Sequence, residues 1–210
     1  MSENDALVAA FIDVRRAYRI IWMYQRRVLD LVSEIAEKFD LVFYAWSPQE
    51  YDRLGRFTTD PTKNWAWDML PLYNTSFLYL PEGADPNRIR AGDWMLEIAV
   101  ISDQGYNGKA LENGEVDASL FLPAEKTRSI LGLYAWRGTK ALDCNWFNSI
   151  WDSEKMDWPK DGELAENARN NIKIVGKVFE LSSLSDYAAV EAAVANFKLL
   201  VGNKLGIKVD

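Results

Sequence analysis

The side chains that most often carry out chemistry in proteins are scarce in this sequence. It contains no histidine, and Cys144 is its one cysteine. Without an imidazole there can be no Ser-His-Asp or Cys-His arrangement and no zinc site of the Cys/His type. No residue near Cys144 in the sequence supplies a base, so we expect a passive thiol. Any catalysis would have to use Asp, Glu, Lys, Arg or Tyr.

Sequence motifs that bind phosphate or metal ions are incomplete in this chain, because required residues are missing at the required spacing. Lys109 and Lys177 each follow a glycine, but both lack the upstream glycine of a P-loop, and no G-x-G-x-x-G occurs. The loop that starts at Asp103 begins like a calcium loop, yet Gly114 stands where a bidentate carboxylate is needed. We therefore expect no cofactor.

A metal-dependent nuclease remains conceivable, because it needs only carboxylates and a lysine. Its usual pattern places an acid two residues before a lysine on one strand, and this spacing does not occur in the chain. Asp93 and Glu97 share one face of a predicted strand but would lie ~13 Å apart, too far for one ion. We interpret them as part of a solvated strand face.

Aromatic residues are unusually frequent, with nine tryptophans in the chain. One irregular stretch contains Trp146, Phe147, Trp151 and Trp158 among acidic residues. Large amphipathic rings mixed with acids are typical of a binding rim, so we predict that these four residues form the main recognition surface for a protein or a small ligand. The alternative is a satellite core, in which the rings fold under the loop and cover one end of the sheet.

A local group of basic residues lies near the beginning of the chain: Arg15, Arg16, Arg19, Arg26 and Arg27. Such a stripe could bind phosphate groups. The chain as a whole has a formal net charge of -7, whereas nucleic-acid surfaces usually have a basic excess. We therefore interpret the arginines as a solvated face with intramolecular partners, and nucleic acid is not the expected partner.

The elements that position these groups begin with a long amphipathic helix over residues 1–40. Apolar residues recur at alternating spacings of four and three, which is a heptad pattern. Its members are Leu7, Phe11, Val14, Tyr18, Ile21, Val28, Val32, Ile35 and Phe39, with Gln25 as the polar exception. This helix would be about 50 Å long, against ~40–45 Å for a compact body of this chain length. We expect its apolar seam to pack on its own sheet or on a second copy, giving a homodimer.

Short apolar or alternating runs predict about five to six strands within residues 41–181. They lie at 41–46, 76–80, 93–101, 118–122, 128–136 and 172–181. The first should be a buried strand, and a change of phase at Gly176 suggests a bulge in the last. Short helices are expected after Ser47, over 61–69 and within 160–171.

A final helix is predicted over residues 183–203, capped by Ser183 or Ser185 and ended by Gly202. The strands mostly follow one another without a full helix between them. This order favours an α+β fold in which the long N-terminal helix and the C-terminal helix pack on a mostly antiparallel or mixed sheet. No linker divides the chain, so residues 1–210 should form a single domain.

These features favour a non-catalytic protein-interaction or regulatory domain that binds an unidentified protein partner. A metal-dependent carboxylate enzyme acting on phosphodiesters is the alternative, and a small-ligand sensor with a tryptophan-lined pocket is the third candidate. The sequence has neither a secretory signal pattern nor an apolar run of ~20 residues. We expect a cytoplasmic protein without a membrane partner.

Overall fold

The computed structural model describes residues 3–49, 72–106, 120–152, 158–167 and 171–209. The helices are α1 (Glu3–Lys38) and α2 (Tyr187–Leu205). The strands are β1 (Leu41–Pro48), β2 (Asn74–Pro81), β3 (Trp94–Ile101), β4 (Ile130–Gly138), β5 (Leu164–Asn167) and β6 (Ile172–Glu180). Two short 3-10 turns, Ala124–Lys126 and Leu181–Ser183, and a π-helical turn, Trp146–Trp151, complete the described elements.

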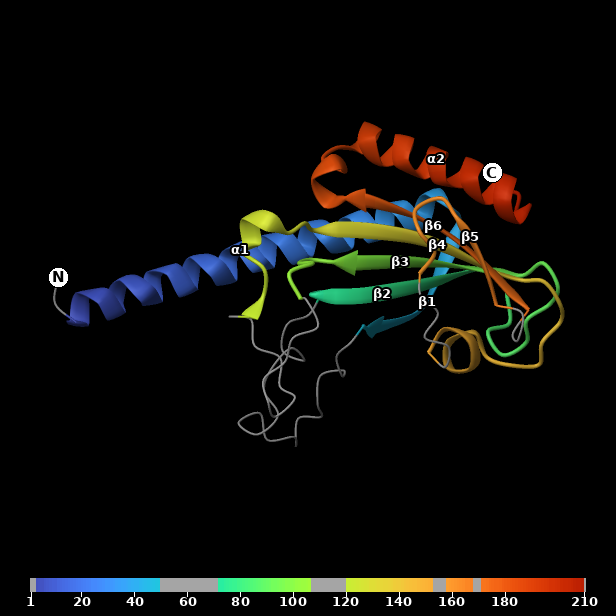
Figure 1. Cartoon of the computed structure of the whole chain (residues 1–210), viewed down its shortest axis with the longest axis horizontal. Coiled ribbons are helices and arrows are strands. Elements are labelled where there is room, and N and C mark those ends of the chain that lie inside the picture. Colours follow the sequence, from blue (N-terminus) through green and yellow to red (C-terminus); the bar gives the residue numbers. More distant parts are fainter. Residues whose placement is uncertain (1–2, 50–71, 107–119, 153–157, 168–170, 210) are drawn as a thin grey trace.

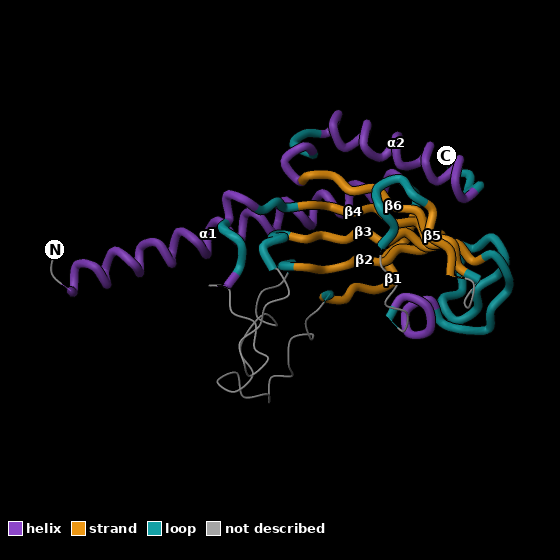
Figure 2. Tube along the Cα trace, viewed as in Figure 1, coloured by secondary structure: helices purple, strands orange, loops and turns teal. Residues whose placement is uncertain are grey.

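The strands form one antiparallel sheet in the order β1-β2-β3-β4-β6-β5. Buried side chains of α1 and α2 belong to the same apolar cluster, so both helices cover one face. Figure 2 shows the π-helical turn across the strands from α2. The predicted α+β fold, with two helices on an antiparallel sheet of about six strands, is therefore confirmed.

The helix-covered face holds the larger core. Phe39, next to the end of α1, makes edge contacts with Phe197 of α2 at 6.0 Å and with Trp94 of β3 at 6.4 Å between ring centroids. Burying each apolar side chain of this kind stabilises the fold by about 1.5–3 kcal/mol. The buried residues that the helices contribute are Val28, Leu31, Val32, Ile35, Ala36, Val190, Val194, Phe197, Val201 and Leu205.

The opposite face holds a second core, built between the sheet and the loops around the π-helical turn. Its fully or largely buried members are Leu78, Leu80, Ile89, Met95, Ala99, Tyr134, Trp136, Trp146, Ile150, Ile172 and Ile174. Because β3 is thus covered on both faces, its alternating pattern does not mark a boundary between core and solvent.

The predicted bulge at Gly176 is wrong. β6 pairs with β4 in an unbroken register in which Gly176 lies opposite Tyr134. A Cβ atom at position 176 would collide with the ring of Tyr134, so glycine is needed to make room for that ring. The register shift occurs instead in β1, between Phe43 and Ala45.

β1 also differs from the prediction of a buried strand. It lies at the edge of the sheet, and Val42, Phe43 and Trp46 keep 47%, 56% and 44% of their surface exposed. The strand continues through Pro48, so no helix begins at Ser47. Most of that predicted helix, and all of the one over 61–69, lies outside the described residues.

Two further assignments from the sequence are corrected. The segment 160–171 contributes β5, which pairs with β6, where a short helix was expected. Leu120–Leu122 do not form a strand, and the rest of the run predicted over 118–122 lies outside the described residues.

The ends of α2 follow from local hydrogen bonding. Asp186 is the N-cap, because its carboxylate accepts a 2.9 Å hydrogen bond from the Ala189 amide. Asp186 therefore takes the place expected for Ser183 or Ser185. Gly202 lies inside the helix, which ends at Gly206 with a φ of 64° in the left-handed region.

Candidate functional site

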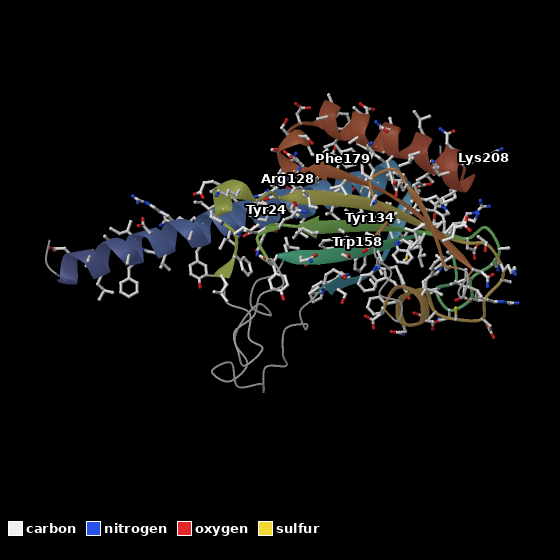
Figure 3. The ribbon with its side chains drawn as sticks, viewed as in Figure 1. Tyr24, Arg128, Tyr134, Trp158, Phe179 and Lys208 are labelled. Carbon is white, nitrogen blue, oxygen red and sulfur yellow. The ribbon has the colours of Figure 1, made fainter. Side chains whose placement is uncertain are left out.

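Helix α1 leaves the body of the protein at a defined point. The Tyr24 hydroxyl donates a 2.8 Å hydrogen bond to Ser102 Oγ at the end of β3. Arg27 donates a 2.9 Å hydrogen bond to the Leu184 carbonyl, and Val28 is the first buried residue among the side chains described from position 5 onward. Figure 3 labels Tyr24 where the helix meets the sheet, and Figure 1 shows the preceding turns extending beyond the strands. The first part of the helix therefore overhangs the body, as its length relative to a compact body of this chain length suggested.

Residues 5–23, which we call the projecting segment, carry large apolar side chains on an exposed helix. Their exposed fractions range from 38% for Ile12 to 72% for Tyr18. Most helical stability in proteins comes from packing an amphipathic face, and exposed apolar patches of this kind mark interaction sites. The large apolar residues concerned are Leu7, Val8, Phe11, Ile12, Val14, Tyr18, Ile20, Ile21, Trp22 and Met23.

The apolar seam predicted from the heptad pattern runs through both parts of α1. Its members Val28, Val32, Ile35 and Phe39 are 2–4% exposed and lie in the core with the sheet and α2. Its earlier members continue the same stripe along the projecting segment, where Phe11, for example, is 54% exposed. The seam therefore packs on its own sheet only after Tyr24, and the projecting part presents the same apolar pattern to the outside.

The charges of the projecting helix are segregated along its axis. All acids between residues 3 and 27 lie at or before position 13, and all five arginines lie at or after position 15. Asp13 and Arg16 meet at the boundary, 3.0 Å apart, with both side chains at least 70% exposed. An exposed pair of this kind contributes little to stability.

The predicted arginine stripe is divided by the fold. Arg15, Arg16 and Arg19 are exposed on the projecting segment. Arg26 lies over the ring of Trp22, at 5.9 Å from its centroid, and Arg27 holds the carbonyl groups of Leu184 and Ser185. The last two arginines thus have intramolecular contacts, and one of them fixes α1 to the body.

The aromatic stretch forms a capped π-helical turn. Asn145 is the N-cap, accepts a hydrogen bond from the Asn148 amide, and receives a 3.1 Å hydrogen bond from Tyr44. The Asp152 amide donates to the Phe147 carbonyl at 2.8 Å, five residues back. This wider turn brings residues five apart nearer to one face than an α-helix would.

The four predicted recognition residues lie together in the second core to different extents. Trp146 is 1% exposed, whereas Phe147, Trp151 and Trp158 are partly buried. Phe147 and Trp151 are 5.2 Å apart between ring centroids. This packing has the geometry of the satellite core that we gave as the alternative, while the recognition role of the three partly exposed rings stays a prediction.

A buried carboxylate organises this aromatic cluster. Glu97, in the middle of β3, is fully buried and accepts hydrogen bonds from Ser76 Oγ at 2.6 Å and from the Trp136 indole at 2.8 Å. Burial raises the pKa of this carboxyl group, and hydrogen bonds from Ser76, Trp151, Trp136 and Trp158 act in the opposite direction. Our interpretation of Glu97 as part of a solvated strand face is therefore wrong.

The Tyr134 ring fills the space beside Glu97. Tyr134 stacks on Trp158 with 4.9 Å between ring centroids and 17° between ring planes. Its pKa is raised, first by burial and then by the nearby carboxylates of Glu97 and Asp161. The phenol therefore stays neutral and acts as a packing surface for Trp158.

These contacts restrict what the Glu97 carboxylate can do chemically. Ser76 and Trp136 each donate to one of its two oxygens, and Trp151 and Trp158 are further hydrogen-bond donors toward it. A buried carboxyl group with these donors serves as a structural acceptor that links the aromatic rings to β3. The sequence offered one signal that we missed: Glu97 is flanked on its own face by Met95 and Ala99, which are both buried.

A family model described as PM0109 matches residues 4–206 of the chain. The chain belongs to the PM0109 family. It is 24% identical over 220 residues to the "Uncharacterized protein PM0109" of Pasteurella multocida (strain Pm70), a match that covers 100% of both chains. No solved structure matches the chain.

The PM0109 match includes the projecting helix. The matched range begins at residue 4, so the projecting segment of α1 belongs to the unit that the family shares. Neither α1 nor α2, the long helices of the described part, combines the length and apolar character needed to cross a bilayer.

Proposed function

We propose that this PM0109-family protein is a non-catalytic interaction domain that associates with a second copy of itself through the projecting segment of α1. One observation carries the proposal: an apolar heptad seam that is buried after Tyr24 continues, exposed, along residues 7–21. Glu97 is fully buried and accepts hydrogen bonds from Ser76 and Trp136, which supports a structural rather than a catalytic role for this acid.

The energetics favour covering this surface. The seam offers Leu7, Phe11, Val14, Tyr18 and Ile21 from each copy. Full burial of such a side chain is worth about 1.5–3 kcal/mol. Because these side chains are on average about half covered already, we expect about half of that value for each, or roughly 8–15 kcal/mol for two copies. This gain is comparable with the ~4–15 kcal/mol cost of association, which places the pair in the range of reversible association.

A second copy is the occupant that the charges favour. The acidic first part of the helix and its arginine-rich second part have opposite charges. Two such helices can therefore place the acids of one beside the arginines of the other. An anionic membrane surface would attract the arginines but repel the acids of the first part, including Asp5 and Asp13. We therefore argue for the second copy, and vesicle binding becomes one outcome of the test.

The test compares two neighbouring isoleucines of the projecting segment. Ile21 lies on the seam and Ile20 lies off it, and they are 43% and 61% exposed. Ile21→Glu should shift the protein to monomer in sedimentation velocity at tens of micromolar. Ile20→Glu makes the same chemical change one residue away, and this variant should still associate.

Both substitutions change exposed side chains, so thermal unfolding of the monomer should be unaffected and misfolding would be visible as a lower melting temperature. Equal association of wild type and Ile21→Glu would overturn the proposal. So would a wild type that stays monomeric but binds vesicles containing anionic lipid, since that result identifies a membrane surface as the occupant.

A further inference from the structure

We infer that two copies pair their projecting segments antiparallel, about a twofold axis close to Arg16. This inference rests on the proposed self-association and adds its orientation and register. Three observations carry it: the phase of the heptad seam, the point at which the seam enters the body, and the separation of charge along the helix.

The heptad phase permits a register in which every exposed seam residue has a partner. Antiparallel coiled coils place each a position opposite a d position of the other helix. With the axis near residue 16, this rule pairs Val14 with Tyr18 and Phe11 with Ile21, and it places Leu7 beside Gln25. The single polar seam residue then lies at the end of the pair, at the position nearest the body.

Neighbouring registers fit less well. Moving the axis by half a heptad toward the body would pair Phe11 with Val28, which is 2% exposed and already packed on the sheet. Moving it the other way would place Ile21, which is 43% exposed, opposite the polar residue Asn4. The register centred near residue 16 therefore uses the whole exposed seam and no buried part of it.

Charge separation selects the antiparallel orientation. In this orientation Asp13 lies at the level of the other copy's Arg19, and Asp5 lies at the level of Arg27. A parallel pair would instead set the five arginines of one helix beside the five of the other. Charges along such a rod interact over the Debye length of about 10 Å, so axial placement matters even for side chains on the outer faces.

The antiparallel pair would hold two protein bodies apart. Val28, where α1 enters the body, is 12 residues from the axis, so at ~1.5 Å per residue each body begins about 18 Å from it. The two points of entry would lie about 36 Å apart at opposite ends of a helical rod. The rod thereby presents two identical sheets, each with its own tryptophan cluster, at a fixed spacing.

Disulfide trapping tests this arrangement. Cys144 is the chain's one cysteine and is partly buried, so Cys144→Ser gives a cysteine-free background. In that background we would prepare Leu7→Cys and Gln25→Cys as separate chains, one of them tagged, then mix and oxidise them. We expect rapid formation of the mixed disulfide, because the two positions are paired across the interface. We expect no Leu7→Cys disulfide with itself, because those positions would be about 27 Å apart.

The outcomes separate this inference from the proposed function. Self-linked Leu7→Cys chains without the mixed product would establish a parallel pair and overturn the inference while leaving self-association intact. Association that persists without either disulfide would overturn the register. Sedimentation of the Cys144→Ser chain is the control that the background itself still associates. A wild-type chain that is monomeric would overturn both the inference and the proposed function.

Discussion

The indole nitrogen of Trp136 lies 2.8 Å from Oε2 of Glu97, on the face of the sheet opposite the helices. This hydrogen bond joins neighbouring strands β3 and β4 and ties the buried carboxylate to the aromatic cluster. Glu97 thus links β3 to the second core, and its removal should affect stability rather than self-association.

Glu97→Gln should destabilise the fold by about 1–3 kcal/mol. The new amide NH2 group would face hydrogen-bond donors, such as the Trp136 indole, from which the carboxylate now accepts. Urea unfolding of wild type and variant measures the difference. Glu180→Gln is the control, since Glu180 is exposed and pairs with Arg128 at the surface. Its cost should be less than about 1 kcal/mol. An equal effect of both changes would contradict the structural role of Glu97.

The pH dependence of stability should also reveal Glu97. Burial raises its pKa above the ordinary value of 4.5, so the folded state holds this proton more tightly than the unfolded state. Its contribution is therefore fully present below that ordinary value and is lost as the pH rises through the folded pKa. The stability advantage of wild type over Glu97→Gln should be larger at pH 5 than at pH 8. The opposite trend in urea titrations at the two pH values would show that the pKa is lowered.

Gly176→Ala should destabilise the protein by about 1–3 kcal/mol, because the new methyl group meets the Tyr134 ring. Gly202→Ala is the matched control, since the Cβ there meets only the Ile207 carbonyl at 3.7 Å and lies within α2. This second change should stabilise the fold by about 0.5–1 kcal/mol. Melting temperatures measured by calorimetry should therefore move in opposite directions.

Asp13→Lys should weaken self-association by about two- to fivefold at low salt, because the antiparallel pair places position 13 near Arg19 of the other copy. The effect should fade at high salt, where such charges are screened. Asp30→Lys makes the same change on an exposed residue of α1 beyond the projecting segment and should have little effect. Sedimentation at two salt concentrations measures both, and a stronger effect of Asp30→Lys would argue against the register.

Sequence patterns predicted the helices and the sheet because those elements have strong periods. The heptad seam identified α1, and the alternation around Trp94, Leu96 and Ile98 identified β3. The same alternation misled us about Glu97, because the layer that covers its face comes from residues about 50 positions further along the chain. Alternation of apolar and polar residues indicates that the two faces of a strand differ. It does not indicate whether a segment distant in the sequence covers the more polar face.

Other features of the fold depend on single contacts that no sequence pattern predicts. The glycine at position 176 suggested a bulge, but it leaves room for the ring of Tyr134 on the neighbouring strand. Asp186 displaced two serines as the cap of α2 because its carboxylate reaches the Ala189 amide. Whether the seam of α1 would be covered by its own sheet or left outside depended on where the sheet ends, which is a property of the folded body.

Self-association of the full chain is the central claim, and the molar mass in solution tests it most directly. Size-exclusion chromatography with light scattering at tens of micromolar should give twice the 24.0 kDa mass of one chain, with the mass falling on dilution. A constant mass of 24.0 kDa across the same concentrations, with α1 still helical by circular dichroism, would contradict the account.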